Sequence, residues 1–272
     1  MIEGKTKYIT LFAGVSFLGR VTSKDDITAG DGARHDVVLG KAKLATRITC
    51  NVFEALRRGG VESAYIGRIG PTSFLTYIVD MIPVEVVVRG EAQGSYCKRN
   101  PSVRAGTKLG ARVVEFFYKT KGRRIGELVL PGDDPLMIFA KNGRSVALHR
   151  PDMETGAESY IADLLVTEEE CKDLELQLHI ARGEALKAFD TLARYWMRQG
   201  GTLQDIKFEY GVTEDGTILL ADVVDCDSWR VMWRGIGISK QPYRDGDDPE
   251  RVLEIYRLGA ALTDQFLNLP VA

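Results

Sequence analysis

The chain has 272 residues, which is enough to bury a substantial core as one large domain or as two modest ones. The hydrophobic share of 44% and the charged share of 27% are ordinary for a globular protein. The 36 Lys and Arg residues nearly balance the 38 Asp and Glu residues, and the formal charge of −2 excludes a global field that would recruit nucleic acid or an acidic membrane surface.

Neither the cysteines nor the apolar runs indicate secretion or a membrane span. The four cysteines are scattered, with no Cys-x-x-Cys pair, which argues against a zinc site and against a disulfide scaffold. Charges interrupt residues 1–7 before an apolar run can form, so we expect no signal peptide. No stretch approaches the roughly 18 apolar residues of a transmembrane helix. We expect a cytoplasmic protein.

The first part of the chain is predicted to consist of strands around one helix. Strands are expected at 7–13 and 15–22, followed by a Gly/Asp-rich loop at 28–34. Residues 41–58 carry apolar side chains at helical spacing and end at Gly59, which predicts a helix. Further short strands are expected around 61–68, 73–79, 82–89 and 111–118.

The middle of the chain combines an irregular connector with a long helix. Residues 119–165 are the least regular part, and we predict a loop-rich connector with a weak sheet element. Thr167 and Glu170 have the spacing of a capping box, in which each side chain satisfies a free amide of the first turn. They predict the start of a long helix that ends at Gly200.

The last part of the chain predicts a hairpin and a final helix. Strands at 203–212 and 217–224 flank a turn at 213–216, and the last helix begins at Asp248 and ends near residue 266. The order of elements predicts an α+β protein of two lobes with a cleft between them. We place the divide near residue 80, which gives lobes of residues 1–80 and 81–272.

The first candidate site is the segment Gly4-Lys5-Thr6-Lys7. Residues two apart on a strand share a face, so Lys5 and Lys7 would project two ammonium groups to one side. Beside a backbone kept open by Gly4, this pair would hold a polyphosphate. A solvated edge strand, whose lysines discourage aggregation, explains the same fragment and is the more common case.

The second candidate site follows the apolar strand that ends in Arg89. A Gly94-Ser95 turn comes next, and then Lys98 and Arg99. The planar guanidinium of Arg89 with the hydroxyl of Ser95 suits a phosphate monoester, because the fork matches phosphate oxygens bidentately. A buried strand followed by an ordinary basic loop explains the segment equally well.

The third candidate site is the hairpin, where Asp205, Lys207 and Glu209 alternate with apolar residues and give one charged face. With a four-residue turn at 213–216, Lys207 would face Asp222. Three carboxylates would then converge and repel unless a cation joins them, which favours Mg²⁺ beside phosphates. This register has a cost, because it places two apolar residues of the second strand on the charged face. A water-facing strand neutralised by Lys207 is the alternative.

Two weaker candidates are loops. The loop Thr28–Arg34 would contact an anion or a substrate, although Gly-Asp-Gly is also ordinary turn chemistry. Lys240 and Arg244 would close over a site or simply lead into the last helix. No glycine pattern forms a Walker or Rossmann fingerprint.

In their order and spacing, these segments resemble the SAICAR synthetase (phosphoribosylaminoimidazole-succinocarboxamide synthase) family. The matching stretches are 3–7, 27–34, 81–99, 205–211 and 220–230, with 243–245. Val223 stands where many bacterial members carry Glu, and segments 228–230 and 240–245 are also more similar to the synthetase half of the animal bifunctional enzyme.

The resemblance implies a two-lobed α+β fold, with antiparallel sheets, flanking helices and an ATP cleft between the lobes. It implies that ATP is bound by Gly4, Lys5 and Lys7 near Met81, and that Mg²⁺ is bound by Glu209 and Asp222. It implies substrate contacts from Asp31, Arg34, Arg89, Ser95 and Arg230, with Asp205 and Lys207 as the catalytic groups that line the ribotide. Lys240 and Arg244 are the candidates for the aspartate pocket.

The activity implied by the resemblance is an ATP- and Mg²⁺-dependent ligation in purine synthesis. L-aspartate would be joined to carboxyaminoimidazole ribotide through an acyl phosphate, and a homo-oligomer is expected. Other hypotheses remain open: a paralogue that amidates a related heterocyclic carboxylate in nucleoside natural-product synthesis, a small-molecule kinase, or a nucleotide-binding module without activity.

Overall fold

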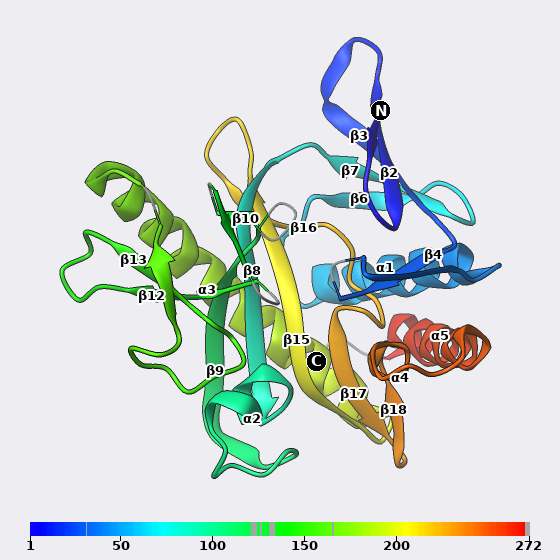
Figure 1. Cartoon of the computed structure of the whole chain (residues 1–272). Coiled ribbons are helices and arrows are strands. Elements are labelled where there is room, and N and C mark those ends of the chain that lie inside the picture. Colours follow the sequence, from blue (N-terminus) through cyan, green and yellow to red (C-terminus); the bar gives the residue numbers. More distant parts are fainter. Residues whose placement is uncertain (31, 121–123, 126, 131–133, 165, 270–272) are drawn as a thin grey trace.

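Two antiparallel sheets and the helices that pack on them organise the protein (Figure 1). The computed structural model describes residues 1–30, 32–120, 124–125, 127–130, 134–164 and 166–269. The helices are α1 (Lys41–Arg58), α2 (Ser95–Arg99), α3 (Glu168–Arg198), α4 (Gln241–Arg244), α5 (Pro249–Asp264) and the short 3₁₀ helix η1 (Gln265–Asn268). In the described part of the chain, no helix is long and apolar enough to cross a membrane.

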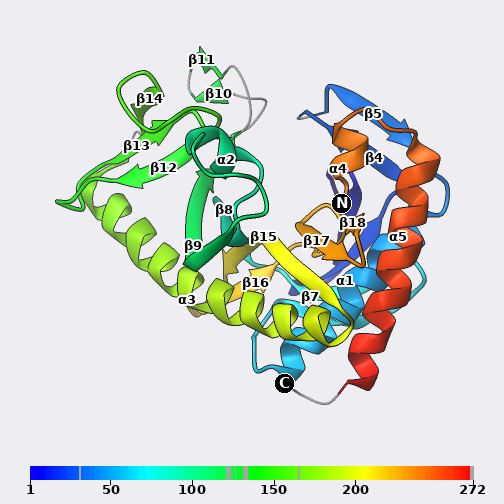
Figure 2. The same ribbon diagram turned by 90° about the horizontal axis from the view of Figure 1, so that it is seen from below.

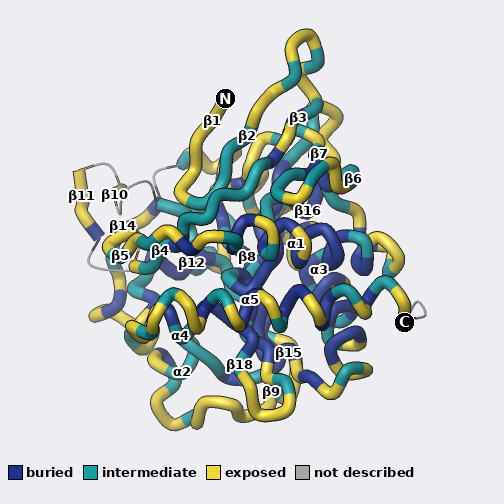
Figure 3. The backbone as a smooth tube through the Cα atoms, turned by 90° about the vertical axis from the view of Figure 1, so that its right-hand side faces the viewer, coloured by how far each residue is buried: buried dark blue, intermediate teal, exposed yellow. Residues whose placement is uncertain are grey.

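The smaller sheet has five strands in the order β1-β2-β3-β7-β6. Its strands are β1 (Ile2–Glu3), β2 (Lys7–Phe12), β3 (Val15–Ser23), β6 (Tyr65–Arg68) and β7 (Ser73–Tyr77). The predicted strands on either side of Gly14 are confirmed, and Gly14 has a φ of 75°, which suits the tight turn between them. The β2–β3 hairpin projects from the body of the molecule (Figure 1), and its tip is exposed (Figure 3).

The predicted loop 28–34 is more ordered than expected. β4 (Asp26–Ala29) and β5 (Arg34–Val37) pair as antiparallel strands, and the Gly32 amide donates to the Ala29 carbonyl at 3.2 Å between them. The turn chemistry was therefore recognised, but the short strands on both sides of it were not.

The larger sheet has nine strands, in the order β14-β13-β12-β9-β8-β15-β17-β18, with β16 paired to β15. Its central strands are β8 (Asp80–Glu91), β9 (Lys108–Tyr118), β15 (Gly201–Val212) and β16 (Ile218–Ala221), flanked by β17 (Trp229–Trp233) and β18 (Ile236–Ile238). The other flank is formed by β12 (Leu136–Phe139), β13 (Val146–His149) and β14 (Tyr160–Asp163), and β10 (Arg124–Ile125) pairs separately with β11 (Leu128–Val129).

The connector predicted at 119–165 is loop-rich as expected, but its sheet element is larger than predicted, because three strands of the large sheet lie there. Each is four residues long, too short to show a clear alternation of apolar and polar residues. The first of them joins the sheet at a single paired position, Leu136 opposite Phe117. Such non-local pairing is set by the rest of the sheet and not by local sequence.

Helix α3 covers one face of the large sheet (Figure 1). The predicted capping box is present: the Thr167 hydroxyl accepts from the Glu170 amide at 3.2 Å, and a Glu170 carboxylate oxygen accepts from the Thr167 amide at 2.7 Å. The apolar face of α3 is buried against the sheet, with Ala181, Ala185 and Phe189 fully enclosed. Alternate residues of β8 and β15 face α3 and enter the same core.

The two sheets separate between Tyr77 and Asp80, close to the predicted divide at residue 80. Helix α1, however, packs against both α3 and α5, and its buried residues share one hydrophobic core with the large sheet. Figure 2 shows α1 lying beside α5, on the opposite side of the molecule from β12 and β13. The division into lobes of residues 1–80 and 81–272 stays a prediction.

Candidate active site

The charged residues of β8 and β15 lie on the face of the large sheet opposite α3. Arg89 is paired with Asp205 across the two strands, and Glu85 with Glu209. Directly opposed residues of antiparallel strands point to the same side, so these four side chains share one face with Lys207. The charged face of β15 therefore lies where the alternation of its sequence placed it.

This face forms the wall of a cavity of about 1000 Å³. Most of the substrate and catalytic residues predicted from the sequence line it: Arg89, Ser95, Asp205, Lys207, Arg230, Lys240 and Arg244. They come from separate parts of the chain, on β8, α2, β15, β17 and α4, with Lys240 as the N-cap of α4. Val87 and Phe117 add an apolar patch to the same wall.

A row of three charged residues crosses three neighbouring strands of this wall. Asp205 on β15 lies between Arg89 on β8 and Arg230 on β17, and each arginine places Nη1 at 2.7 Å from Asp205 Oδ2. Arg89 and Asp205 are each only 3% exposed, whereas Arg230 is half-buried. Ser95 Oγ is 3.2 Å from Arg89 Nη2. This row, with Ser95, is called the arginine cradle below.

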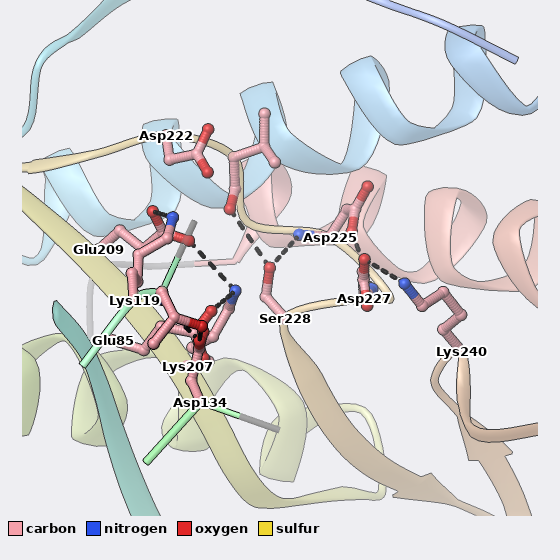
Figure 4. Close-up of polar contacts among 12 residues, drawn as sticks. Glu85, Lys119, Asp134, Lys207, Glu209, Asp222, Asp225, Asp227, Ser228 and Lys240 are labelled. Atoms are coloured by element: carbon pink, nitrogen blue, oxygen red, sulfur yellow. Dashed lines mark hydrogen bonds and ion pairs between the residues drawn. The ribbon is translucent and has the colours of Figure 1, made fainter. Parts of the chain in front are cut away.

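A second cluster surrounds Lys207 (Figure 4). Its Nζ is 2.7 Å from Glu85 Oε1 and 3.1 Å from Glu209 Oε1, while Lys119 contacts the other oxygen of Glu209. Burial alone would lower the pKa of Lys207, but Glu85 and Glu209 raise it above its ordinary value. Lys207 therefore stays protonated and acts as a fixed positive charge.

The same cluster sets the charge of Glu209. Burial would raise the pKa of Glu209, but Lys207, Lys119 and Lys7 lower it to about 2. Glu209 is therefore an anion at neutral pH, as a ligand for a divalent cation must be.

Asp222 does not lie where the sequence predicted it. The predicted register, with Lys207 facing Asp222, was wrong by one residue: Glu209 pairs with Ala221, and β16 ends there. β15 ends at Val212 and β16 begins at Ile218, so the turn spans residues 213–217, one residue more than expected, and Thr213 and Thr217 hydrogen-bond to each other within it. The predicted register would have placed Leu220 on the charged face. In the observed register Leu220 is paired with Tyr210, and both side chains are buried in the core.

The carboxylate of Asp222 reaches the smaller sheet. Asp222 leaves the strand with a φ of 63°, and its side chain contacts Lys7 on β2. Burial lowers the pKa of Lys7 to about 8, although Glu209 raises it in part. Asp222 and Glu209 therefore share Lys7 as a charged neighbour, but the predicted convergence with Asp205 is wrong, because Asp205 is held by the two arginines.

A third cluster lies around Asp227, apart from the Lys207 cluster (Figure 4). Lys240 contacts Asp227 Oδ2, and Arg244 Nη2 is 2.7 Å from Asp227 Oδ1. Burial would raise the pKa of Asp227, but Lys240 and Arg244 lower it below its ordinary value. The two cations predicted for an aspartate pocket therefore share one carboxylate.

The remaining predicted residues are outside this cavity lining or outside the described residues. Arg34 donates to the carbonyl oxygens of Tyr243 and Asp247 at 2.7 and 2.8 Å, and its guanidinium lies 4.0 Å from the centre of the Tyr243 ring. This geometry gives Arg34 a structural role beside α4, and its predicted substrate contact stays untested. Asp31 lies outside the described residues.

The residues predicted for ATP lie around the junction of the two sheets. The Gly4 amide donates to the Lys7 carbonyl at 2.8 Å, Lys5 is exposed beside it, and Met81 at the start of β8 is 44% exposed and paired with Gly211. The ion pair between Lys7 and Asp222 connects these residues to the end of β16. The nucleotide-binding role of these residues stays a prediction.

Sequence reasoning missed several charged residues of the site. Glu85 lies four residues before Arg89 on one strand, so period-two spacing would have placed both on the same face. Lys119 directly follows β9 and gave no such signal. Lys98 lines the cavity as a cation, whereas Arg99 is absent from the lining and is buried against Glu115 and the Pro151 carbonyl.

Comparisons with known proteins identify one family. The family model of SAICAR synthetase matches residues 1–128 and 145–249. The phosphoribosylaminoimidazole-succinocarboxamide synthase of Herpetosiphon aurantiacus is 34% identical over 269 residues, covering 98% of this chain and 91% of the relative. The bifunctional phosphoribosylaminoimidazole carboxylase/phosphoribosylaminoimidazole succinocarboxamide synthetase of Drosophila melanogaster is 32% identical over 252 residues, covering 90% of this chain and 51% of the relative.

A solved structure, that of a type-2 SAICAR synthetase in complex with ADP, has a TM-score of 0.75 at 25% identity and covers 96% of each chain. The predicted α+β fold and enzyme class are confirmed by these matches. The identities of 34% and 32% are too close to place the chain nearer to the bacterial or the animal form, so that prediction stays open. The chain belongs to the SAICAR synthetase family, whose members are ligases of purine biosynthesis.

Proposed function

We propose that the protein joins L-aspartate to carboxyaminoimidazole ribotide, with hydrolysis of ATP to ADP and phosphate, in de novo purine synthesis. The observation that supports this most strongly is that the arginine cradle and Lys207 line one cavity, with Glu209 in contact with Lys207. A phosphate-binding end and a carboxylate-activating end are what the ribotide requires.

The cradle would bind the 5′-phosphate. Arg230 is the more accessible guanidinium, and Ser95 adds a hydroxyl beside Arg89. Planar guanidiniums bind phosphate oxygens bidentately, and the cradle presents two of them at fixed positions, on the strands β8 and β17 that flank β15. Asp205, predicted as a catalytic group, would position both arginines, since its Oδ2 accepts from both.

Glu209 and Asp222 fit a magnesium site. They supply hard oxygen ligands, and each is paired with lysine ammonium groups that a divalent cation would replace. Among the described residues, no group of three or more His, Cys, Asp or Glu side chains is placed to hold a metal ion. Two carboxylates with substrate phosphates and water are a usual Mg²⁺ set. Mg²⁺ held there would neutralise charge on the ATP phosphates.

The reaction requires that a poor electrophile be activated. Transfer of the ATP γ-phosphoryl group to the ribotide carboxylate gives an acyl phosphate and ADP. The aspartate nitrogen then attacks the acyl carbon, the C–O bond to phosphate breaks, and the nitrogen loses its proton. Lys207, held protonated between Glu85 and Glu209, would stabilise negative charge near the carboxylate as the phosphoryl group moves.

The aspartate substrate would bind at the Asp227 cluster. Lys240 and Arg244 present two cations to one place through Asp227. A dicarboxylate would compete with Asp227 for these cations, so the pocket would exchange one carboxylate for another. Both side chains line the cavity that the arginine cradle also lines.

A coupled assay tests this function directly. ADP formation is measured with ribotide, Mg²⁺·ATP and L-aspartate together, and then with each omitted. We expect ADP release only with all three, with one SAICAR formed for each ADP. ADP release without L-aspartate would favour a small-molecule kinase, and turnover only with another heterocyclic carboxylate would favour a specialised paralogue.

We also propose cytoplasmic residence and a homo-oligomeric state. All four cysteines are free thiols, which agrees with a reducing compartment. Sedimentation at micromolar concentration would test the oligomeric state; a single species at the monomer mass of 30.1 kDa would contradict it.

A further inference from the structure

We propose that Glu115 is a positioning residue for the phosphate end of the ribotide, an inference that rests on the proposed function of the arginine cradle. Glu115 belongs to β9 and is paired with Val87 of β8. Paired residues share a face, so its carboxylate lies on the same side of the sheet as the cradle. It is set back from the cavity and lies behind Arg89.

Glu115 accepts hydrogen bonds from two buried arginines. Its Oε2 is 2.7 Å from Arg89 Nε, and its Oε1 contacts Arg99 Nη2. The side chains of both arginines are 4% exposed, and that of Glu115 is 12% exposed. Little solvent reaches this carboxylate between two guanidiniums, so its loss would remove the anion that Arg99 and Arg89 share and would leave Arg89 with Asp205 as its carboxylate partner.

The contact with Glu115 fixes the plane of the Arg89 guanidinium. Arg89 carries five N–H groups: Nε donates to Glu115, Nη1 to Asp205 and to the Gln93 carbonyl, and Nη2 lies near Ser95. Glu115 therefore holds one edge of the plane and Asp205 holds the other. The remaining Nη2 donor, beside the Ser95 hydroxyl, is left to face a ligand oxygen.

The resulting chain of charges alternates in sign. It runs Arg99, Glu115, Arg89, Asp205 and Arg230, with three cations and two anions. The single positive excess suits a phosphate, and the alternation keeps neighbouring guanidiniums from repelling each other. With a neutral residue 115, Arg99 and Arg89 would lose the anion between them, Arg89 would depend on Asp205 alone, and its guanidinium would turn away from the Ser95 hydroxyl.

The experiment compares Glu115→Gln with Asp264→Asn. Asp264 also accepts from two side chains, Arg47 Nε at 2.7 Å and Asn51 Nδ2 at 2.8 Å, but it lies at the end of α5, against α1. The control therefore loses a comparable charged hub in another part of the molecule. The readouts are the Kd of ribose 5-phosphate, and the KM values of ribotide and of ATP, for the full chain.

We expect Glu115→Gln to raise the Kd of ribose 5-phosphate and the KM of ribotide about tenfold or more, and the KM of ATP less than about twofold. Glu115→Asp keeps the charge on a shorter side chain and should recover part of the affinity. If Glu115→Gln does not fold, the same constants are measured with Glu115→Asp. Asp264→Asn should lower thermal stability without changing the Kd of ribose 5-phosphate or the KM of ribotide.

Two outcomes would overturn the proposal. In the first, Glu115→Gln changes the Kd of ribose 5-phosphate and the KM of ribotide no more than Asp264→Asn does. In the second, Glu115→Gln raises the KM of ATP as much as the KM of ribotide. Failure of the proposed function is distinguishable. A wild-type protein that binds ribose 5-phosphate but forms no SAICAR would remove the ligase activity, while the Kd comparison would still decide the role of Glu115.

Discussion

The arginine cradle and the Lys7–Asp222 contact are built in different ways. The cradle lies within one sheet, where the register of β8, β15 and β17 alone brings Arg89, Asp205 and Arg230 into a row. The Lys7–Asp222 contact joins β2 of the smaller sheet to the end of β16 in the larger one. The cradle is therefore fixed by strand pairing, whereas the proposed nucleotide site depends on how the two sheets are placed.

This difference suits two kinds of ligand. A ribotide phosphate needs a preorganised set of donors, and a buried row of paired charges provides one. A triphosphate with Mg²⁺ needs carboxylates and ammonium groups that exchange partners when it binds. The lysine pairs of Glu209 and Asp222 are suited to such an exchange.

The largest expected effect is in the nucleotide region. Asp222→Asn keeps the shape of the side chain but removes a ligand charge, so we expect kcat to fall about 100-fold or more. Ribose 5-phosphate should bind as in wild type, since the cradle is untouched. Steady-state kinetics at limiting and saturating Mg²⁺ checks this, and near-normal turnover at limiting Mg²⁺ would remove Asp222 from the site.

The next effect is in the cradle. Arg89→Lys keeps one positive charge, but a single ammonium group cannot hydrogen-bond to Glu115, Asp205 and Ser95 at the positions that the guanidinium reaches. We expect the KM of ribotide to rise about 30- to 100-fold, and the KM of ATP to change less than about threefold. Parallel titrations of both substrates check the difference; an equal loss for both would mean that the two regions are not separate.

Gly94→Ala should have a smaller effect on the cradle. Gly94 has a φ of 55° and a ψ of −129°, which strains any other residue, and a Cβ there would lie 2.7 Å from Arg230 Nη2. We expect a loss of about 1–3 kcal/mol in the free energy of unfolding and a rise of about five- to tenfold in the KM of ribotide. Urea unfolding and kinetics measure the two effects, and an unchanged KM would show that Arg230 does not contact the ribotide.

The smallest effect concerns pH and the Asp227 cluster. The pKa of Asp227 is lower in the folded protein than its ordinary value of 3.8, mainly through Lys240 and Arg244. The stabilisation is therefore fully present above pH 3.8 and is lost as pH falls toward the folded pKa. The urea midpoint of wild type should exceed that of Asp227→Asn at pH 6, and the gap should shrink below about pH 4. A gap that does not depend on pH would contradict the pairing.

The parts of the site that could be predicted from the sequence are those set by local periodicity. The alternation of Asp205, Lys207 and Glu209 placed their common face, and the Thr167 capping box located the start of α3. A turn one residue longer than expected shifted the partner of Glu209 to Ala221, because turn length and strand register are coupled.

The parts that could not be predicted depend on pairing between distant segments. The contact of Lys7 with Asp222 forms only when the two sheets are placed side by side. The strands β12 to β14 join the large sheet through one paired position on β9, which their local sequence does not specify. Lys98 lines the cavity and Arg99 does not, because Arg99 is bound by Glu115, which lies on another strand.

The most direct test of the account is a crossed titration of two variants with two ligands. Arg89→Lys and Lys7→Met are each titrated with ribose 5-phosphate and with Mg²⁺·ATP by calorimetry. The account predicts that Arg89→Lys loses affinity for the sugar phosphate alone and that Lys7→Met loses affinity for the nucleotide alone. Comparable losses of both ligands in either variant would contradict the separation of the two sites.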